Sequence, residues 1–321
     1  ADEAREVFDS SNGNSEIMIM GYVTGEDLEW AISEGVSFFI YDMHRVHEAA
    51  DFALKLEKKA RIHIELETGF NRTGFNAAGL LELMDFLEDN MDFFEIEGAT
   101  THYAGAESVA NHVRVRKQKE IFEQLCAWME RQGVKIGLRH TACSAAALAY
   151  PDARMDMVRI GILQYGFWPS RETLIQYLTR EGEQIRDPLS RIIKWKSRVM
   201  SVKKVSRGEF VGYGTSFLAE QDMHVATVPV GYSHGYTRAL SNQGRVLIGD
   251  KRYGVIGMVN MNVMMVDITE TPDIQVGQDV ILIGTDGEKE ISVASFGELS
   301  NQMNYELLVR IPHNIPRYIV D

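Results

Sequence analysis

The sequence predicts an α/β protein in two parts, an N-terminal part of alternating strands and helices and a mostly β C-terminal part. Between Glu16 and about Ile162, short β-rich apolar runs alternate with longer segments of helical period, which is typical of a parallel sheet built from βα units. After about Glu181 these segments give way to short strands with glycine-centred turns. The length of 321 residues and the hydrophobic content of 45% allow a sizeable buried core.

Six apolar runs in the N-terminal part are predicted strands. They span residues 17–21, 38–42, 62–66, 94–102, 135–142 and 157–162. The predicted helices span residues 1–10, 26–34, 46–59, 77–87 and 109–132. Gly133 directly follows the last of these helices, where a glycine commonly ends a helix.

The strand count leaves two architectures open. A closed (β/α)8 barrel of the TIM type needs eight strands and about 250 residues, so about six of eight units would be present and roughly 60 residues would be missing from the front. An open doubly wound sheet would be satisfied by six strands. No predicted strand, however, is followed by the glycine-rich fingerprint of a dinucleotide-binding fold.

The C-terminal part reads as short strands joined by tight turns. The predicted strands span residues 197–205, 224–230, 245–248, 263–267 and 279–283. Gly249-Asp250 and Asp286-Gly287 lie between apolar runs, where hairpin turns are expected. A polar stretch that ends at Pro188 separates the two parts, and we place the domains at residues 1–185 and 186–321.

Composition favours an enzyme acting on a small molecule. The net charge of −13, with 46 acidic against 33 basic residues, argues against nucleic-acid and anionic-membrane partners. Cys126 and Cys143 form no disulfide framework, and no Cys/His spacing indicates a metal site. No apolar run approaches the roughly 18 to 20 residues of a membrane span, and the first residues of the sequence carry neither the basic nor the apolar region of a secretory signal. We therefore expect a cytoplasmic protein.

One segment resembles a known family closely. Residues 62–75, which read IHIELETGFNRTGF, resemble the strand and loop of the alanine racemase family that read approximately hlKvDTGMnRlGf. Seven further blocks follow in the family's order. They span residues 101–104, 140–147, 158–166, 212–215, 231–238, 257–267 and 304–306. The resemblance covers essentially the whole chain and implies a barrel that binds pyridoxal 5′-phosphate (PLP), a C-terminal β domain, and a head-to-tail homodimer with shared active sites.

The resemblance implies a set of cofactor-binding residues. Ser144 and the backbone N–H groups of Gly161 and Ile162 match the phosphate site that follows two barrel strands, a usual place for phosphate in this architecture. Tyr305 matches the tyrosine that reaches the phosphate from the β domain. Arg159 matches the arginine that faces the pyridine nitrogen, and because an arginine does not give up its proton, the ring nitrogen stays unprotonated.

The resemblance also implies the proton-transfer groups. Tyr213 matches the tyrosine base that acts on one face of the substrate from the neighbouring subunit. His102 matches the histidine that hydrogen-bonds this tyrosine within the cofactor site. A tyrosine with a pKa near 10 needs a nearby cation to act as a base, and the series Tyr213, His102, Arg159 supplies one.

Three residues match the family's substrate contacts. Arg72 matches the arginine that contacts the cofactor hydroxyl and the substrate carboxylate. Met261 matches the residue whose backbone N–H contacts that carboxylate, and Tyr232 matches a tyrosine of the substrate entry. The implied reaction is two-base racemisation of L-alanine and D-alanine, which supplies D-alanine for peptidoglycan.

The largest departure from the family is a lysine. The family's Schiff-base lysine lies at the end of the first barrel strand in a motif similar to KanAYGHG, which this sequence does not contain. The lysines present lie on predicted helices, at the start of a strand or in the β domain. We therefore expect that an N-terminal segment carrying this lysine is missing and that residues 1–321 alone are inactive.

Smaller departures bear on substrate preference and positioning. Glu65 stands where many members carry a carbamylated lysine, so a carboxylate replaces the carbamate, and its contact with Arg72 is left open. The other departures are Glu67 for Asp, Cys143 for Asn, His234 for Asp and Asn262 for Asp.

Each site residue also has a plain structural interpretation when taken alone. His102, Tyr213 and Tyr232 would be packing residues, Arg72 and Arg159 ion-pair residues, Ser144 a helix cap, and Cys143 a small buried residue rather than a nucleophile. The collinear pattern favours the functional interpretation for Arg72, His102, Tyr213 and Arg159. Two alternatives to alanine racemisation stay open, namely a serine or broad-specificity racemase and a non-catalytic remnant that binds PLP or only dimerises.

Overall fold

The chain forms two compact units. The computed structural model describes residues 1–179, 186–293, 296 and 304–320. The first unit comprises residues 1–161 and 168–187, and the second comprises residues 162–167 and 188–321. The domain boundary expected between residues 185 and 186 adjoins residues 180–185, which lie outside the described residues. A short segment, 162–167, belongs to the second unit although it precedes that boundary.

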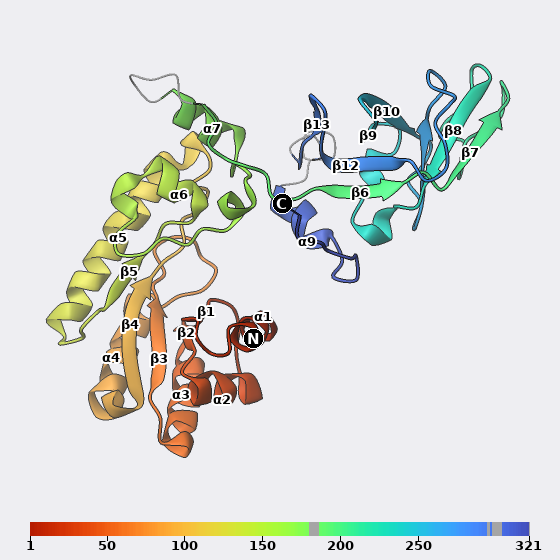
Figure 1. The fold of residues 1–321 in the computed structure, drawn as a ribbon. Coiled ribbons are helices and arrows are strands. Elements are labelled where there is room, and N and C mark those ends of the chain that lie inside the picture. The colour runs from red at the N-terminus through yellow and green to blue at the C-terminus, as the bar shows by residue number, and fades with distance from the viewer. Residues whose placement is uncertain (180–185, 294–295, 297–303, 321) are drawn as a thin grey trace. The chain divides into compact units, whose positions relative to one another are not determined.

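The first unit is a partial barrel made of one parallel sheet (Figure 1). Its strands in spatial order are β1 (Met18–Ile19), β2 (Ser37–Ile40), β3 (Ala60–Glu65), β4 (Phe94–Thr100) and β5 (Leu138–His140), each parallel to the next. The helices that precede and connect them are α1 (Asp2–Ser10), α2 (Gly25–Glu34), α3 (Met43–Leu56), α4 (Ala77–Asn90) and α5 (His112–Arg131). Consecutive strands are neighbours because each helix returns the chain to the same end of the sheet.

Local signals explain where the helices begin and end. The strand expected to reach Asp42 stops at Ile40, because the Asp42 side chain caps α3 by accepting a hydrogen bond from the Arg45 N–H (2.8 Å). The α5 helix ends one residue before Gln132, and Gly133 has a φ of +91°, the conformation that a closing glycine allows.

The expected sixth strand, residues 157–162, was wrong. This segment meets the sheet at a single bridge, between Cys143 and Arg159, with the Arg159 N–H donating to the Ala142 carbonyl (2.9 Å). Met155, just before it, has a φ of +47°, which bends the chain into the segment. A short 3-10 turn, Ile162–Tyr165, follows at once, so no ladder develops.

Two short helices were not predicted, namely α7 (Arg171–Leu178) and α9 (Asn304–Arg310). A third, α6 (Ser144–Ala149), was foreseen only through the interpretation of Ser144 as a helix cap. A capping box between Ser170 and Thr173 begins α7, a signal that the sequence carries but whose eight-residue helix is too short for a clear apolar period.

The two faces of the parallel sheet differ in chemistry. Ile62 and Ile64 on β3 belong to the apolar cluster formed with the helices. Alternate residues of a strand point to opposite faces, so His63 and Glu65 occupy the other face, and both are buried. The barrel interior therefore carries polar side chains at the level where the site residues lie.

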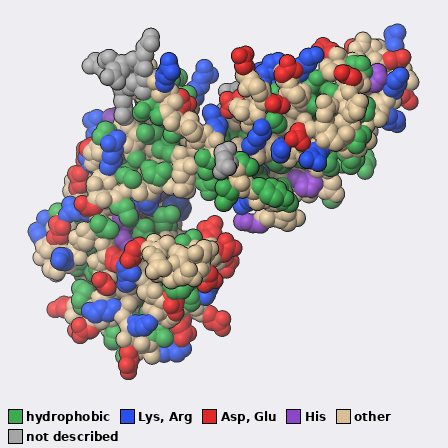
Figure 2. Space-filling view, viewed as in Figure 1, with side chains coloured by type: hydrophobic (Ala, Val, Ile, Leu, Met, Phe, Trp, Pro, Cys, Tyr) green, Lys and Arg blue, Asp and Glu red, His purple; other side chains and the backbone are tan. Residues whose placement is uncertain are grey.

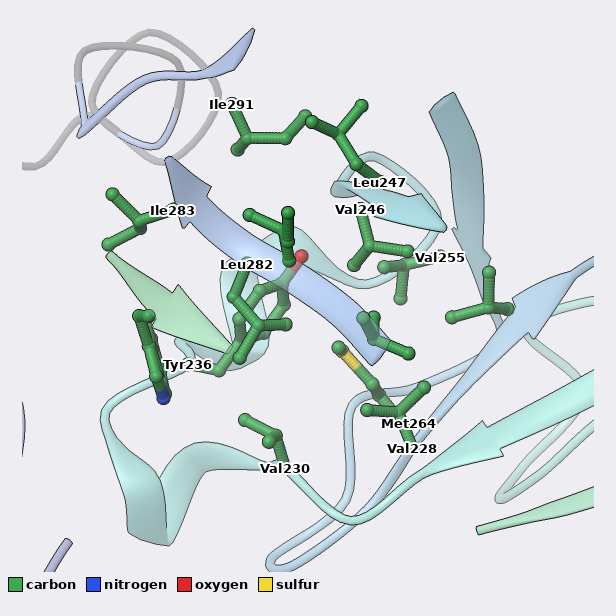
Figure 3. Packing of buried hydrophobic residues seen from close by; sticks show 14 of the residues in the cluster. Val228, Val230, Tyr236, Val246, Leu247, Val255, Met264, Leu282, Ile283 and Ile291 are labelled. Atoms are coloured by element: carbon green, nitrogen blue, oxygen red, sulfur yellow. The ribbon is translucent and has the colours of Figure 1, made fainter. Parts of the chain in front are cut away.

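The second unit is an antiparallel sheet with its own core. Its strands are β6 (Trp195–Arg198), β7 (Ser201–Val205), β8 (Met223–Val228), β9 (Arg245–Ile248), β10 (Lys251–Ile256), β11 (Met264–Asp267), β12 (Asp279–Asp286) and β13 (Lys289–Ile291). The spatial order is β13-β12-β9-β10-β11-β8-β7, with β6 paired to β12. Figure 3 shows the buried side chains that converge from these strands, among them Val228, Val246, Met264 and Leu282.

Two predictions about this sheet need correction, and two are confirmed. The expected strand 197–205 is two strands, because β6 pairs with β12 whereas β7 pairs with β8. The strands β10 and β13 were missed. Both expected hairpin turns are confirmed, since Ile248 pairs with Lys251 and Asp286 pairs with Lys289, with Gly249 and Gly287 at positive φ.

Replacing Asn76 by alanine is expected to lower the free energy of unfolding by about 1 kcal/mol. Asn76 is exposed and caps α4, its side chain accepting a hydrogen bond from the Gly79 N–H (2.9 Å). Urea unfolding measures the change. The control is Asn76→Asp, which keeps the acceptor and should stay near wild type; an equal loss in both variants would contradict the capping role.

Candidate functional site

The Arg159 side chain is held in one orientation by the ends of two neighbouring strands, β4 and β5. Its Nη1 donates to Thr100 Oγ1 (2.9 Å), to the His140 carbonyl (2.7 Å) and to His140 Nδ1 (2.7 Å). Its Nη2 donates to the carbonyls of Thr101 (2.9 Å) and Thr141 (3.2 Å). Nε is the one nitrogen of this guanidinium without an acceptor among the described residues. Burial lowers the pKa of Arg159, but a guanidinium still stays charged at neutral pH.

His102 lies two residues beyond the end of β4, beside the loop that carries Arg72. The Phe70 ring lies edge-on to the His102 ring, with 5.4 Å between their centroids. The Arg72 guanidinium carbon lies 4.5 Å from the centroid of the same Phe70 ring. Phe70 thus separates the two predicted site residues and holds both by packing. Burial, reinforced by the positive charges of Arg159 and Arg72, lowers the pKa of His102 to about 4, so its ring is neutral near pH 7.

Gln118 on α5 ties the two site loops together, and sequence analysis missed it. Its side-chain amide donates to the His102 carbonyl (3.0 Å) and to Thr68 Oγ1 (3.2 Å), and accepts from the Ala104 N–H (2.8 Å). It is only 1% exposed. A glutamine on the buried face of an otherwise amphipathic helix was the available signal, because a buried amide needs partners.

Two glutamates that depart from the family shape the Arg72 loop. Glu67 accepts hydrogen bonds from the backbone N–H groups of Gly69 and Asn71, which closes the loop just before Arg72. Glu65 accepts a hydrogen bond from Thr73 Oγ1 (2.9 Å) rather than from Arg72. Burial raises the pKa of Glu65, and the positive charge of Arg72 partly offsets that rise, so this pair interacts through space.

The expected phosphate residues lie together in part. Ser144 is the first residue of α6, and its hydroxyl accepts a hydrogen bond from the Gly161 N–H (2.9 Å). The position before it, that of the helix cap, belongs to Cys143, whose side chain makes no capping bond. Ile162 is buried and belongs to the core of the second unit.

Tyr213, Tyr232 and Met261 lie on loops of the second unit and are 71%, 46% and 56% exposed, respectively. Tyr213 lies between two glycines at positive φ, Gly212 and Gly214, in a tight turn. Tyr305 lies on α9 and is 42% exposed. The side chains of these four residues are therefore accessible at the surface of the second unit.

Direct hydrogen bonds join the loops of Tyr232 and Met261. The Tyr232 N–H donates to the Asn260 carbonyl (3.0 Å), and the Ser233 hydroxyl donates to the Met261 carbonyl (2.8 Å) and to Asn262 Oδ1 (2.7 Å). A Cβ on Gly231 would lie 2.1 Å from the Asn260 oxygen, so this close approach requires glycine.

Two substitutions relative to the family thus have local roles. The His234 ring nitrogen Nδ1 accepts a hydrogen bond from the Gly231 N–H (3.2 Å), which closes the same turn. The Asn262 side-chain oxygen Oδ1 accepts a hydrogen bond from the Ser233 hydroxyl. Both residues stabilise the loop pair and leave Tyr232 and Met261 presented outward.

A charged surface, a membrane span or a metal site in the described residues would each indicate another function. Acidic and basic side chains are interspersed over the face of each unit that Figure 2 shows. No helix among residues 1–179, 186–293 and 304–320 is both long and apolar enough to cross a membrane. Within the same described ranges, no three His, Cys, Asp or Glu side chains cluster as metal ligands would.

His102 and His140 are expected to stay neutral at pH values well below those at which histidine usually takes up a proton. Burial, with the charge of Arg159, lowers the pKa of His140 from 6.5 to about 3, as it lowers that of His102 to about 4. The unfolded chain takes up protons at both residues near pH 6.5, whereas the folded chain does not. The contribution of these two histidines to the free energy of unfolding is therefore fully present above about pH 6.5. It decreases as the pH falls from there toward 4 and 3.

Histidine NMR titration checks this pH dependence residue by residue, with urea unfolding at pH 7 and pH 5 as the companion measurement. The His102→Gln variant, which cannot titrate, should lose less stability between these two pH values than wild type. A titration midpoint near 6.5 for His102 or His140 in the folded protein would contradict the buried, cation-facing positions described above.

Comparison with known proteins identifies close relatives. The family model described as "Alanine racemase, N-terminal domain" matches residues 1–169, and "Alanine racemase, C-terminal domain" matches residues 192–319. The chain is 33% identical to the alanine racemase of Clostridium perfringens strain ATCC 13124, over 99% of this chain and 78% of that protein. It is also 33% identical to the alanine racemase of Symbiobacterium thermophilum, over 94% and 77%.

Solved structures give the same result. The crystal structure of alanine racemase from Bacillus anthracis with bound L-Ala-P is similar with a TM-score of 0.87 and 28% identity, covering 100% of this chain and 80% of that chain. Alanine racemase from D-cycloserine-producing Streptomyces lavendulae is similar with a TM-score of 0.91 and 26% identity, covering 100% and 82%.

Proposed function

The chain belongs to the alanine racemase family, and on that premise we propose that the full gene product interconverts L-alanine and D-alanine with PLP as its cofactor. The observation that carries this proposal is the Arg159 guanidinium, fixed by contacts through both Nη atoms while Nε has no acceptor among the described residues. A fixed cation with one free donor suits the unprotonated pyridine nitrogen of PLP.

The other cofactor contacts are proposed from the residues beside Arg159. Ser144 and Gly161, already joined by a hydrogen bond, would hold the phosphate together with the Ile162 N–H and the Tyr305 hydroxyl. His102 would line the site as a neutral ring, since its pKa is lowered to about 4. When bound, PLP withdraws electrons from the substrate Cα and so makes its proton acidic.

Proton transfer and substrate binding are the remaining parts of the proposed mechanism. We assign to the Tyr213 hydroxyl the removal or return of the Cα proton on one face, a role that its exposure permits. Arg72 and the Met261 N–H would bind the substrate carboxylate, and Tyr232 would line the entry. Glu67 would hold the Arg72 loop in place and Gln118 would hold the His102 loop, because each side chain forms a hydrogen bond with the backbone of that loop.

Assembly and cellular role follow as further parts of this proposal. We propose a head-to-tail homodimer in which Tyr213 of each chain serves the active site of the other chain. The D-alanine produced would supply peptidoglycan synthesis, and the enzyme would act in the cytoplasm.

The test is racemisation by the full gene product supplied with PLP. Enantiomer analysis of L-alanine incubations should show D-alanine formed to near equal amounts, and the Tyr213→Phe variant should bind PLP but turn over far more slowly. Faster turnover of serine or larger amino acids than of alanine would assign the site to a broader racemase. PLP binding without turnover of any amino acid would make the protein a non-catalytic binder and overturn the proposal.

A further inference from the structure

The hydrogen bonds that hold Arg159 continue across the inner face of the parallel sheet. Beyond Arg159, His140 Nε2 lies 3.0 Å from His63 Nδ1. His63 Nε2 lies 3.3 Å from a Glu97 carboxylate oxygen. The other Glu97 oxygen accepts from Arg61 Nε (2.5 Å). The series thus crosses β5, β3 and β4 and ends at a carboxylate.

The direction of these hydrogen bonds is determined at both ends. Arg159 can only donate, so His140 Nδ1 must accept and its proton must be on Nε2. His140 then donates to His63 Nδ1, which places the His63 proton on Nε2, directed at the acceptor Glu97. One tautomer of each ring therefore satisfies every contact, and both rings are neutral.

Backbone irregularities make room for this series. The pairing of β3 with β4 shifts between Ile62 and His63, which leaves Glu97 as an extra residue in β4. Such a bulge redirects a side chain. A Cβ on Gly98 would lie 2.7 Å from His63 Nδ1, and a Cβ on Gly137 would lie 2.4 Å from the Glu97 carbonyl oxygen. Glycines at these two positions are therefore needed for the arrangement.

The middle of the series is buried and closely packed. His63 and His140 are 3% and 0% exposed, and burial lowers the pKa of both. Phe39 packs against both rings, with centroid distances of 6.1 Å to His63 and 5.8 Å to His140. If His63 could not accept, the His140 N–H would be buried without a partner, and the ring would be free to turn away from Arg159.

We propose that His140, His63 and Glu97 act as positioning residues that hold the Arg159 guanidinium in the orientation its site requires. They act through Arg159 and touch neither substrate nor cofactor. The relevance to racemisation rests on the proposed function, whereas the positioning of Arg159 does not. We refer to these three residues as the histidine relay.

The first test is independent of activity. In the full gene product without added cofactor, NMR of arginine side chains should show slow rotation of the Arg159 guanidinium, assigned by its loss in Arg159→Lys. His63→Leu should speed this rotation, and His63→Gln, whose amide can accept from His140, should largely restore it. Phe39→Leu is the matched control, because it changes the packing of both rings but removes no hydrogen bond.

The second test uses the PLP-loaded protein. His63→Leu should lower kcat for alanine roughly 10- to 100-fold with little change in KM, and should shift the ¹⁵N resonance of the cofactor ring nitrogen. His63→Gln should recover most of kcat. Equal effects of His63→Leu and Phe39→Leu in both tests would show that the rings only fill space and would overturn the proposal. Slowed rotation that depends on His63, in a protein without racemase activity, would support the histidine relay and refute the proposed function.

Discussion

Replacing Arg159 by glutamine is expected to lower kcat for alanine racemisation roughly 100- to 1,000-fold. Glutamine has no permanent charge and cannot reproduce donors that reach Thr100, Thr101 and His140 while leaving Nε free. Steady-state kinetics of the full gene product at saturating PLP measures the loss. Circular dichroism of the variant verifies that the fold is kept.

The matched comparison is Arg159→Lys. Lysine keeps the charge but lacks the planar fork of donors, so its kcat should lie between that of wild type and that of Arg159→Gln. If Arg159→Gln keeps more than about a tenth of wild-type kcat, Arg159 is not the group that sets the state of the cofactor ring.

Replacing Gly98 by alanine is expected to destabilise the first unit by about 3 kcal/mol. The added Cβ would lie 2.4 Å from the Leu138 carbonyl oxygen and 2.7 Å from His63 Nδ1, so both β5 and the His63 ring would have to move. Urea unfolding gives the difference. Gly21→Ala is the control, since no atom lies within 4 Å of the Cβ it would add. Equal free energies of unfolding for the two variants would show that β5 and the His63 ring can move to accept the added Cβ without destabilising the first unit.

The regular elements of the fold could be predicted from the sequence because their patterns are local. The βα alternation correctly indicated five parallel strands and the helices between them. The segment 157–162 is as apolar as a strand, but the positive φ of Met155 that bends the chain into it has no clear signature in the sequence. The strands β10 and β13 were missed because each lies just after a turn, with charged residues at its start.

The site could be predicted only in part. The resemblance named Arg159, His102 and Arg72, and the structure places all three in the first unit around the ends of neighbouring strands and the loops that follow. His63 and Glu97 could not be foreseen, because the bulge that turns Glu97 toward His63 depends on how β3 pairs with β4. Gln118 lies sixteen residues from His102 along the chain, and only the folded helix brings it to that loop.

Exchange of the Cα proton with solvent is the decisive measurement for PLP-dependent racemisation by this protein. The full gene product, incubated with L-alanine and PLP in D₂O, should yield both enantiomers with deuterium at Cα, and Tyr213→Phe should slow this exchange. We expect no exchange when PLP is removed by dialysis. Interconversion that continues without PLP, or alanine that keeps its Cα proton in the presence of PLP, would contradict it.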